Sequence, residues 1–184
     1  AKSAQAEGDF VPTANEVVCA DVLKTAAGRL DGDTKLDLQF PANLRGRYHS
    51  LPAGYFGNAV LPCVTQAWQA AALIAADDVT LGRAVRAAKE TFTRVAAVDA
   101  VLAWEASRVT KPRHYIEAAG EHVIVTNWST FPFYSVTLGL DMPAYVMPVT
   151  TMWFPLLGFV MPSPPSLPRG LDLIMALPQR GTIS

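Results

Sequence analysis

The sequence predicts one domain of the α/β or α+β class, built on a mixed sheet flanked by helices, and three observations predict it. Helical patterns dominate the chain before Lys111. Strand-like runs separated by proline-rich turns such as "PSPPSLP" fill the last third. The chain has 184 residues, of which 51% are hydrophobic, and this is enough to bury one core.

The first predicted helix begins at a capping box. Thr13 is followed three residues later by Glu16, so each side chain can bond to the other's backbone N–H. The apolar residues of "VVCADVL" come next and are available for burial. The helix is predicted to run to about Ala27, with Gly28 near its end.

A half-buried strand is predicted at residues 34–40. In "TKLDLQF" the polar residues Lys35, Asp37 and Gln39 alternate with apolar ones, which is the pattern of a strand with one face in the core. A loop rich in turn residues and arginine follows, "PANLRGRYHSLPAGYFGN", and leads into the apolar run "AVLPCV".

Two more helices are predicted before the strand-rich region. From Leu81 to Phe92 apolar residues recur at helical spacing, and the basic residues between them are expected to form a solvated face. Glu90 precedes Arg94 by four residues, the order that favours an exposed ion pair. A further helix is predicted over Val98 to Val109.

The strands of the last third are predicted at "EHVIVTNW", "FYSVTL", "PLLGFVM" and "LDLIMAL". The uncharged stretch from Tyr145 to Met161 approaches the length of a membrane span. Pro148 and Pro155 interrupt it, so two buried strands joined by a turn are predicted instead.

Composition excludes several partners and points to one compartment. Lys and Arg (15) balance Asp and Glu (16), so neither nucleic acid nor an anionic membrane is expected to bind. Charged residues make up only 17%, and such a surface is expected to need a partner, although a large-cored monomer is the alternative. Cys19 and Cys63 suit neither a metal site nor a disulfide framework. They predict two core thiols in a reducing, cytoplasmic compartment.

The sequence lacks the common catalytic motifs. It has no G-x-S-x-G, G-x-x-x-x-G-K-S/T, G-x-G-x-x-G, C-x-x-C or H-E-x-x-H pattern. Its histidines are His49, His114 and His122, and none is followed four residues later by aspartate. A general base oriented by a nearby carboxylate is therefore not expected in this chain.

Three segments together resemble the C-terminal half of BAHD acyltransferases. "NLRGRYHSLPAGYFGN" is similar to the family's arginine-containing loop that ends in Y-F-G-N, and "VTNWSTFPFYSV" is similar to its V-T-S/N-W…P-F-Y-x-V segment. Gly139 to Pro143 follows where the family has D-F-G-W-G and then proline. This chain keeps only the central glycine of that motif, in "TLGLD".

The resemblance implies one α/β domain of the chloramphenicol-acetyltransferase-like two-domain fold. Residues 1–12 are expected to be a flexible segment, and residues 13–184 the C-terminal domain, incomplete at its end. Family members carry H-x-x-x-D in their N-terminal half, and this chain has no such motif. The resemblance therefore implies that an N-terminal half with the catalytic histidine is the partner, so the chain is not expected to be active alone.

The resemblance also assigns roles to individual residues. Arg45 would pair with the aspartate of H-x-x-x-D, and Asn58 would support the site. Thr126 and Trp128 alternate along one strand, so a hydroxyl and an indole can share one face as a wall for the acyl acceptor. Arg113, or alternatively Arg108, matches an arginine that some members use for acidic acceptors. The alternatives are that Trp128 is a core residue and that the loop arginines are merely solvated.

The activity implied is transfer of an acyl group from acyl-CoA, with acetyl-CoA expected as the donor, to a hydroxyl or amine of a small molecule. No metal or prosthetic group is expected. Two other interpretations remain open: a non-catalytic binding or scaffold domain of this fold, and a condensation-type half that uses carrier-protein thioesters.

Overall fold

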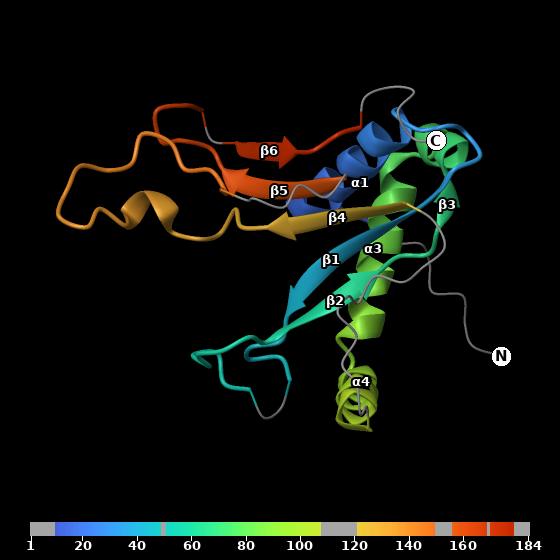
Figure 1. The fold of residues 1–184 in the computed structure, drawn as a ribbon, viewed down its shortest axis with the longest axis horizontal. Helices are drawn as coiled ribbons and strands as arrows, with labels where there is room; N and C mark the ends of the chain where they lie inside the picture. The colour runs from blue at the N-terminus through green and yellow to red at the C-terminus, as the bar shows by residue number, and fades with distance from the viewer. Residues whose placement is uncertain (1–9, 49–50, 108–120, 150–155, 169, 179–184) are drawn as a thin grey trace.

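The computed structural model describes residues 10–48, 51–107, 121–149, 156–168 and 170–178. Within these residues a mixed sheet carries helices against it (Figure 1). The elements in chain order are α1 (Ala14–Ala27), β1 (Lys35–Asn43), β2 (Val60–Val64), β3 (Trp68–Gln69), α2 (Ala70–Ala75), α3 (Asp78–Phe92), α4 (Val95–Ser107), β4 (Glu121–Asn127), the 3-10 turn η1 (Phe133–Ser135), β5 (Leu157–Pro162) and β6 (Leu171–Met175).

The sheet is mixed, as predicted. Its order is β2-β1-β4-β5-β6, with the short β3 also paired to β1. The central neighbours β1, β4 and β5 run parallel, while β2 and β6 are antiparallel to the strands they border. Because β1 and β4 are parallel, the loops that follow them leave the sheet at the same edge (Figure 1).

The prediction of one buried face for β1 is wrong, because both faces of this strand are covered. Asp37 and Gln39 are buried together with the apolar residues that alternate with them. β1 lies inside the sheet between β2 and β4, and His122 of β4 bonds to Asp37 across it. The alternation of polar and apolar residues in β1 therefore did not indicate a solvent-facing side, because the polar residues of this interior strand are buried as well.

The core lies between the sheet and the helices α1 and α3. Cys19 and Cys63 are both buried and unpaired, as predicted. Burial raises the pKa of the Cys19 thiol to about 12, with the Glu16 charge adding to it, and burial raises that of Cys63 to about 11. Both thiols therefore stay protonated and pack as apolar side chains. The fully buried large residues include Leu23, Leu36, Leu38, Leu73, Leu81, Val85, Val123 and Val160.

The capping box of α1 forms as predicted and is extended by an ion pair to α3. The Thr13 backbone N–H donates to Glu16 Oε2 at 2.7 Å, and the Glu16 N–H donates to the Thr13 hydroxyl at 3.4 Å. Arg86 of α3 donates to both Glu16 oxygens, at 2.8 and 2.6 Å. The expectation of a wholly solvated basic face on α3 is therefore wrong at Arg86. This guanidinium also lies over the Phe10 ring, 4.1 Å from its centroid.

Acid is expected to weaken this contact between the helices. Burial raises the pKa of Glu16, but its bonds to Arg86 and to the Thr13 N–H outweigh burial and leave the pKa below its ordinary value. Glu16 therefore binds its proton more tightly in the unfolded chain than in the folded one. Its contribution to the free energy of unfolding is complete above its pKa in the unfolded chain, and it is lost as the pH falls through its pKa in the folded chain. Glu16→Gln is expected to lower the free energy of unfolding by about 2 kcal/mol at pH 7.

Urea denaturation of both proteins from pH 7 to pH 3 checks this expectation. The difference in free energy of unfolding between Glu16→Gln and the unchanged protein should become smaller below about pH 4. Asp21→Asn, on the exposed part of α1, is the matched control and should leave the urea midpoint unchanged. A gap that stays constant over the whole range would show that the Glu16 charge has no part in stability.

α4 begins at Val95, three residues before the predicted start at Val98, and is described to Ser107. The strand predicted at "FYSVTL" is wrong: residues 133–135 form a 3-10 turn, and the chain continues irregularly. Of the two strands predicted between Tyr145 and Met161, the second forms as β5 among the described residues. Residues 145–149 have no regular structure and are largely exposed, while residues 150–155 lie outside the described part of the chain.

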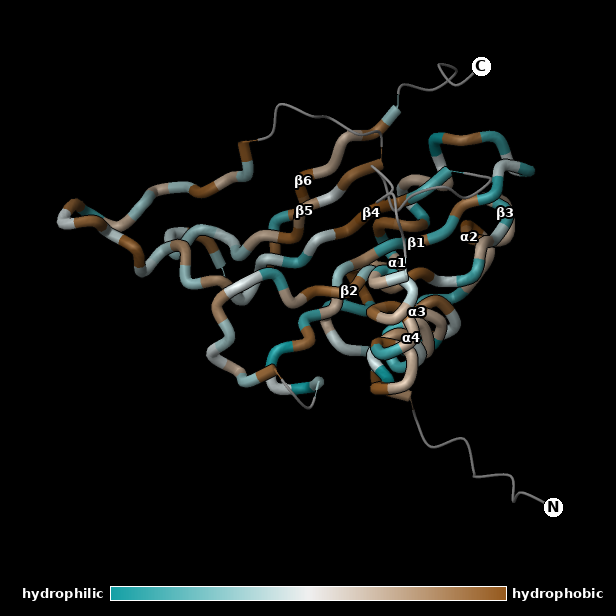
Figure 2. Tube along the Cα trace, turned by 60° about the horizontal axis from the view of Figure 1, so that its bottom comes forward, coloured by the Kyte–Doolittle hydropathy of each residue, from teal (hydrophilic) through white to brown (hydrophobic). Residues whose placement is uncertain are grey.

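Residues 129–149 instead form an arm that extends beyond the sheet at the carboxyl end of β4 (Figure 1). Its tip is a turn closed by the bond from the Leu140 N–H to the Thr137 oxygen at 2.8 Å. Leu138 and Gly139, between these residues, have φ values of 50° and 81°. Hydrophobic segments recur along the arm (Figure 2). Its exposed large apolar side chains are Phe131, Val136, Leu138, Leu140, Met142, Tyr145, Met147 and Val149.

Candidate functional site

Arg45 holds the loop between β1 and β2 from within. Its Nε donates to the Tyr55 carbonyl at 2.8 Å, and its terminal nitrogens donate to the Gly57 carbonyl and to the Asn43 side-chain oxygen. The guanidinium fork has five N–H donors, more than these bonds use. Arg45 can therefore fix the loop and still offer N–H groups to a carboxylate outside it.

The end of this loop presents aromatic residues to solvent. Phe56 is fully exposed and Tyr55 is partly exposed. A Cβ on Gly57 would lie 2.8 Å from the Tyr55 ring, so a larger residue at this position would displace the ring from its place against the backbone. Asn58 is exposed at the rim of a cavity that also includes Tyr55.

Thr126 and Trp128 lie at the carboxyl end of β4 and share one face of the sheet, as their spacing predicted. Thr126 is beside Phe159 of β5 in the strand register, and the Phe159 ring packs edge-on against Trp128, with centroids 5.0 Å apart. The indole also contacts the rings of Phe131 and Phe133, each at 6.2 Å. Trp128 is half-buried in this aromatic cluster, not enclosed in the main core.

Asn127, between them, points the other way and anchors the strand end. Its Nδ2 donates to the Asn15 side-chain oxygen at 2.7 Å, at the start of α1. Its own oxygen accepts from the Ser129 N–H at 2.9 Å and from the Ser129 hydroxyl at 2.6 Å. The chain direction after Trp128 is thus fixed from the helix side.

Sequence reasoning did not identify the aromatic partners of Trp128 or the anchoring role of Asn127. Phe131 and Phe133 are close to Trp128 in sequence, and their spacing around Pro132 was an available signal. Phe159 comes from another strand, and only the pairing of β4 with β5 brings it to Thr126. The Asn127–Ser129 spacing is typical of a side-chain turn and was also available.

The structure does not place the two predicted groups in one pocket. Both lie at the edge where β1 and β4 end (Figure 1). The cavity beside Asn58 is about 310 Å³, and its described lining comes from the 44–61 loop region and α4. None of that lining belongs to β4. Arg113, Arg108, His49 and His114 lie outside the described residues.

His122 is the histidine that the described part of the chain contains, and the expectation that no histidine is oriented by a nearby carboxylate is wrong for it, because Asp37 comes from a neighbouring strand. Its Nδ1 lies 2.9 Å from each carboxylate oxygen of Asp37. Both side chains are nearly buried, at 11% and 10% exposed. The ring projects from one face of the sheet where β1 and β4 pair, and it is not part of the lining of the cavity beside Asn58.

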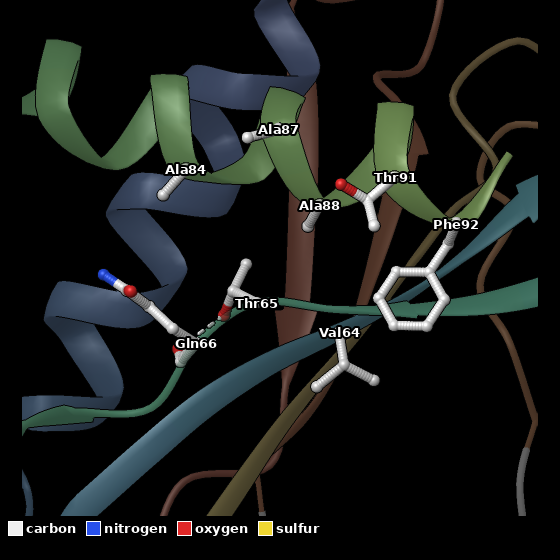
Figure 3. A pocket seen from close by; sticks show the side chains of 8 residues that line it. All are labelled: Val64, Thr65, Gln66, Ala84, Ala87, Ala88, Thr91 and Phe92. Atoms are coloured by element: carbon white, nitrogen blue, oxygen red, sulfur yellow. Dashed lines mark hydrogen bonds between the residues drawn. The ribbon is translucent and has the colours of Figure 1, made fainter. Parts of the chain in front are cut away.

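A second cavity of about 300 Å³ lies between α3 and the end of β2 (Figure 3). One side is formed by α3 residues, and the other by residues at and after the end of β2; the lining is Ala84, Ala87, Ala88, Thr91, Phe92, Val64, Thr65 and Gln66. The Thr65 hydroxyl accepts from the Leu38 N–H and donates to the Gln66 carbonyl, both at 3.0 Å. Its hydroxyl is thus used by the backbone, and no charged group lines the described part of this cavity.

The described residues form a mixed α/β domain, and comparison with known proteins identifies its family. The family model described as the Transferase family matches residues 1–182. The chain therefore belongs to this family, which includes the BAHD-type acyltransferases.

Solved structures of the same fold include TRI101 from F. sporotrichioides with coenzyme A and T-2, at a TM-score of 0.73 and 16% identity, matching 89% of this chain and 39% of that one. Vinorine synthase matches with a TM-score of 0.60 and 18% identity, over 96% of this chain and 40% of that one. TRI101 from F. graminearum with ethyl coenzyme A matches with a TM-score of 0.65 and 17% identity, over 89% of this chain and 38% of that one. The chain thus spans about two-fifths of the length of these structures. None of its described helices is long and apolar enough to cross a membrane.

Proposed function

We propose that this chain is the C-terminal portion of an acyltransferase that moves an acyl group, acetyl in the first instance, from acyl-CoA to a hydroxyl or amine of a small specialised metabolite. Membership of the Transferase family supports the reaction class. The neighbours solved with coenzyme A and ethyl coenzyme A support the donor. Two protonated, unpaired thiols in the core support a cytoplasmic location.

In the proposed mechanism, the histidine of an H-x-x-x-D motif on an N-terminal half takes the acceptor's proton as the acceptor attacks the thioester carbonyl. The tetrahedral oxyanion then collapses and expels the CoA thiolate, which takes up the proton. This chain would supply the wall that orients the acceptor, with the Thr126 hydroxyl and the Trp128 ring on one face. Arg45 would pair with the aspartate of the motif through the N–H groups its own loop does not use.

The observation that carries the proposal is the arm beside this wall. Leu138, Leu140 and Val149 are 89%, 80% and 93% exposed, and further apolar side chains flank them. A folded chain rarely exposes so many large apolar side chains within one segment unless another folded surface covers them. The arm starts directly after Trp128, so a domain that covers it would also face the aromatic cluster. This is the position required of the half that carries the base.

The bond to Asp37 occupies only Nδ1 of His122, so whether this histidine can act as the base depends on where its ring lies. A general base must reach the acceptor's proton within hydrogen-bond distance. Nδ1 of His122 is bound to Asp37, and His122 lines neither the cavity beside Asn58 nor the cavity between α3 and β2. The scaffold interpretation differs in one measurable respect: it expects the assembled protein to bind without turnover.

The chain alone is expected to transfer no acyl group, and transfer should appear when it is co-expressed with a polypeptide carrying H-x-x-x-D from the same enzyme. Thiol release from acetyl-CoA, measured against a panel of alcohols and amines, reports the reaction. The control is the same pair with the motif histidine changed to alanine, which should lower the rate at least 100-fold. Turnover by the chain alone that survives purification would contradict the proposal, and an assembled but inactive protein that binds CoA would favour the scaffold.

A further inference from the structure

The cavity beside Asn58, termed the loop–helix pocket, shares no lining residue with the proposed acceptor wall at Thr126 and Trp128. It lies between the 44–61 loop region and α4 and encloses about 310 Å³. This volume is at the lower end of the range of small-molecule sites. The lining residues are Leu44, Tyr48, Leu51, Tyr55, Asn58, Ala59, Val60, Leu61, Val98, Val101 and Leu102.

The lining is apolar along its length and polar at few points. α4 contributes only aliphatic side chains, Val98, Val101 and Leu102, and the loop region adds leucines opposite them. Val98, Leu44 and Leu61 form a small buried cluster separate from the main core. No charged residue is part of the described lining, so an ionic ligand group has no partner inside the pocket.

The walls are held in place before any ligand binds. The Tyr48 hydroxyl donates to the Asp99 carboxylate and ties the loop to α4. Arg45 fixes the far end of the loop through the carbonyls of Tyr55 and Gly57. A pocket with preset walls loses little ordering entropy when a ligand enters it.

The pocket size limits what it can hold. A water molecule occupies about 30 Å³ in the liquid, so the space accepts on the order of ten non-hydrogen atoms. A polycyclic acceptor is larger than this, whereas a short aliphatic or aryl acyl group fits. At the rim the Asn58 side chain offers amide N–H donors, which suit a carbonyl oxygen.

We propose that the loop–helix pocket binds the acyl group of the donor thioester, with the chain among the leucines and valines and the carbonyl toward Asn58. This inference rests on the proposed function, because that function supplies the thioester. It goes further in assigning donor selectivity to the loop and α4, and in predicting that acyl groups somewhat longer than the acetyl group of the proposed function also fit and bind more tightly.

The test uses small thioesters, S-acyl-N-acetylcysteamines, because they need no binding site for the rest of CoA. The full chain, labelled with ¹³C at leucine and valine methyls, is titrated with the acetyl, butanoyl and hexanoyl compounds. Saturable shifts are expected at the methyls of Leu61, Val101 and Leu102. Affinity should rise about fourfold for each added methylene that is buried.

Filling the pocket should remove this response. Val101→Trp is expected to abolish the dependence on chain length, and Leu102→Trp at the exposed rim should weaken binding at least tenfold if Val101→Trp does not fold. Val79→Trp, on the exposed part of α3, is the matched control and should bind like the unchanged chain. Preserved methyl spectra of the main core report folding.

The outcomes separate this inference from the function beneath it. The pocket assignment is overturned if the methyl shifts are confined to other residues. It is also overturned if the affinities neither depend on acyl chain length nor respond to Leu102→Trp. Acetyl transfer by the assembled enzyme can persist in both cases. Conversely, saturable binding in the pocket by a protein whose assembled form never transfers an acyl group would leave the pocket in place and refute the acyltransferase proposal.

Discussion

Replacing His122 with alanine is expected to lower the free energy of unfolding by about 3 kcal/mol. The reason is the carboxylate it leaves behind. Asp37 is nearly buried in an interior strand, and His122 Nδ1 lies 2.9 Å from both of its oxygens. Without the imidazole this carboxylate has lost its partner across the sheet, and an unpaired buried charge is costly. Urea denaturation at pH 7 measures the loss.

A double variant distinguishes loss of the pair from loss of packing. Asp37→Leu with His122→Phe removes both polar groups and keeps the volume, so it is expected to recover most of the stability lost in His122→Ala. If the free energy of unfolding of His122→Ala lies within about 1 kcal/mol of that of the unchanged protein, the pair of His122 and Asp37 does not stabilise the sheet. His122 would then need another role than joining β1 to β4.

Trp128→Ala in the assembled enzyme is expected to reduce kcat/KM for the acceptor about 30-fold. This corresponds to about 2 kcal/mol, the cost typical of removing a large aromatic contact at a binding site. Because the indole packs on Phe159 beside Thr126, its loss removes the ring surface that would meet the acceptor. The acceptor KM is expected to carry much of the change.

Three measurements accompany this variant. Trp128→Phe keeps a ring at the position and should restore more than half of the lost activity in logarithmic terms. Thr126→Val keeps the shape and removes the hydroxyl, so an effect on transfer with an unchanged melting temperature would assign the hydroxyl to the acceptor. Full activity in Trp128→Ala would remove this wall from the site.

The elements predicted correctly are those whose signals are local or repeat regularly. The capping box at Thr13 and Glu16 fixed the start of α1, because both partners lie within one turn. β4, β5 and β6 were found from apolar runs bounded by turn residues. A local signal is unaffected by the neighbours that the folded chain brings in.

The errors arise where distant contacts decide the structure. The segment from Phe133 to Leu138 has the composition of a strand but no neighbouring strand to pair with, so it leaves the sheet as part of the arm. Arg86 looks like a surface residue in its helix until α1 brings Glu16 to it. Asp37 follows the pattern of a solvated face until His122 arrives from another strand.

The candidate site shows the same division. Alternation along β4 correctly placed Thr126 and Trp128 on one face, because strand geometry alone determines it. The loop residues Arg45 and Asn58 were selected by resemblance, and their roles in catalysis stay predictions. Asn58 lines a pocket formed with α4 and not with β4. This arrangement depends on how the 44–61 loop region packs against α4, which no sequence pattern indicates.

The turn at the tip of the arm indicates how this segment tolerates substitution. Gly139 has a left-handed backbone, and nothing lies within 4 Å of the place where its Cβ would stand, so handedness alone restricts the position. The adjacent Leu138 accepts the same handedness at a cost of about 1 kcal/mol. Substitution at Gly139 is therefore limited by backbone handedness and not by packing, so a larger side chain there would cost conformational energy without a clash.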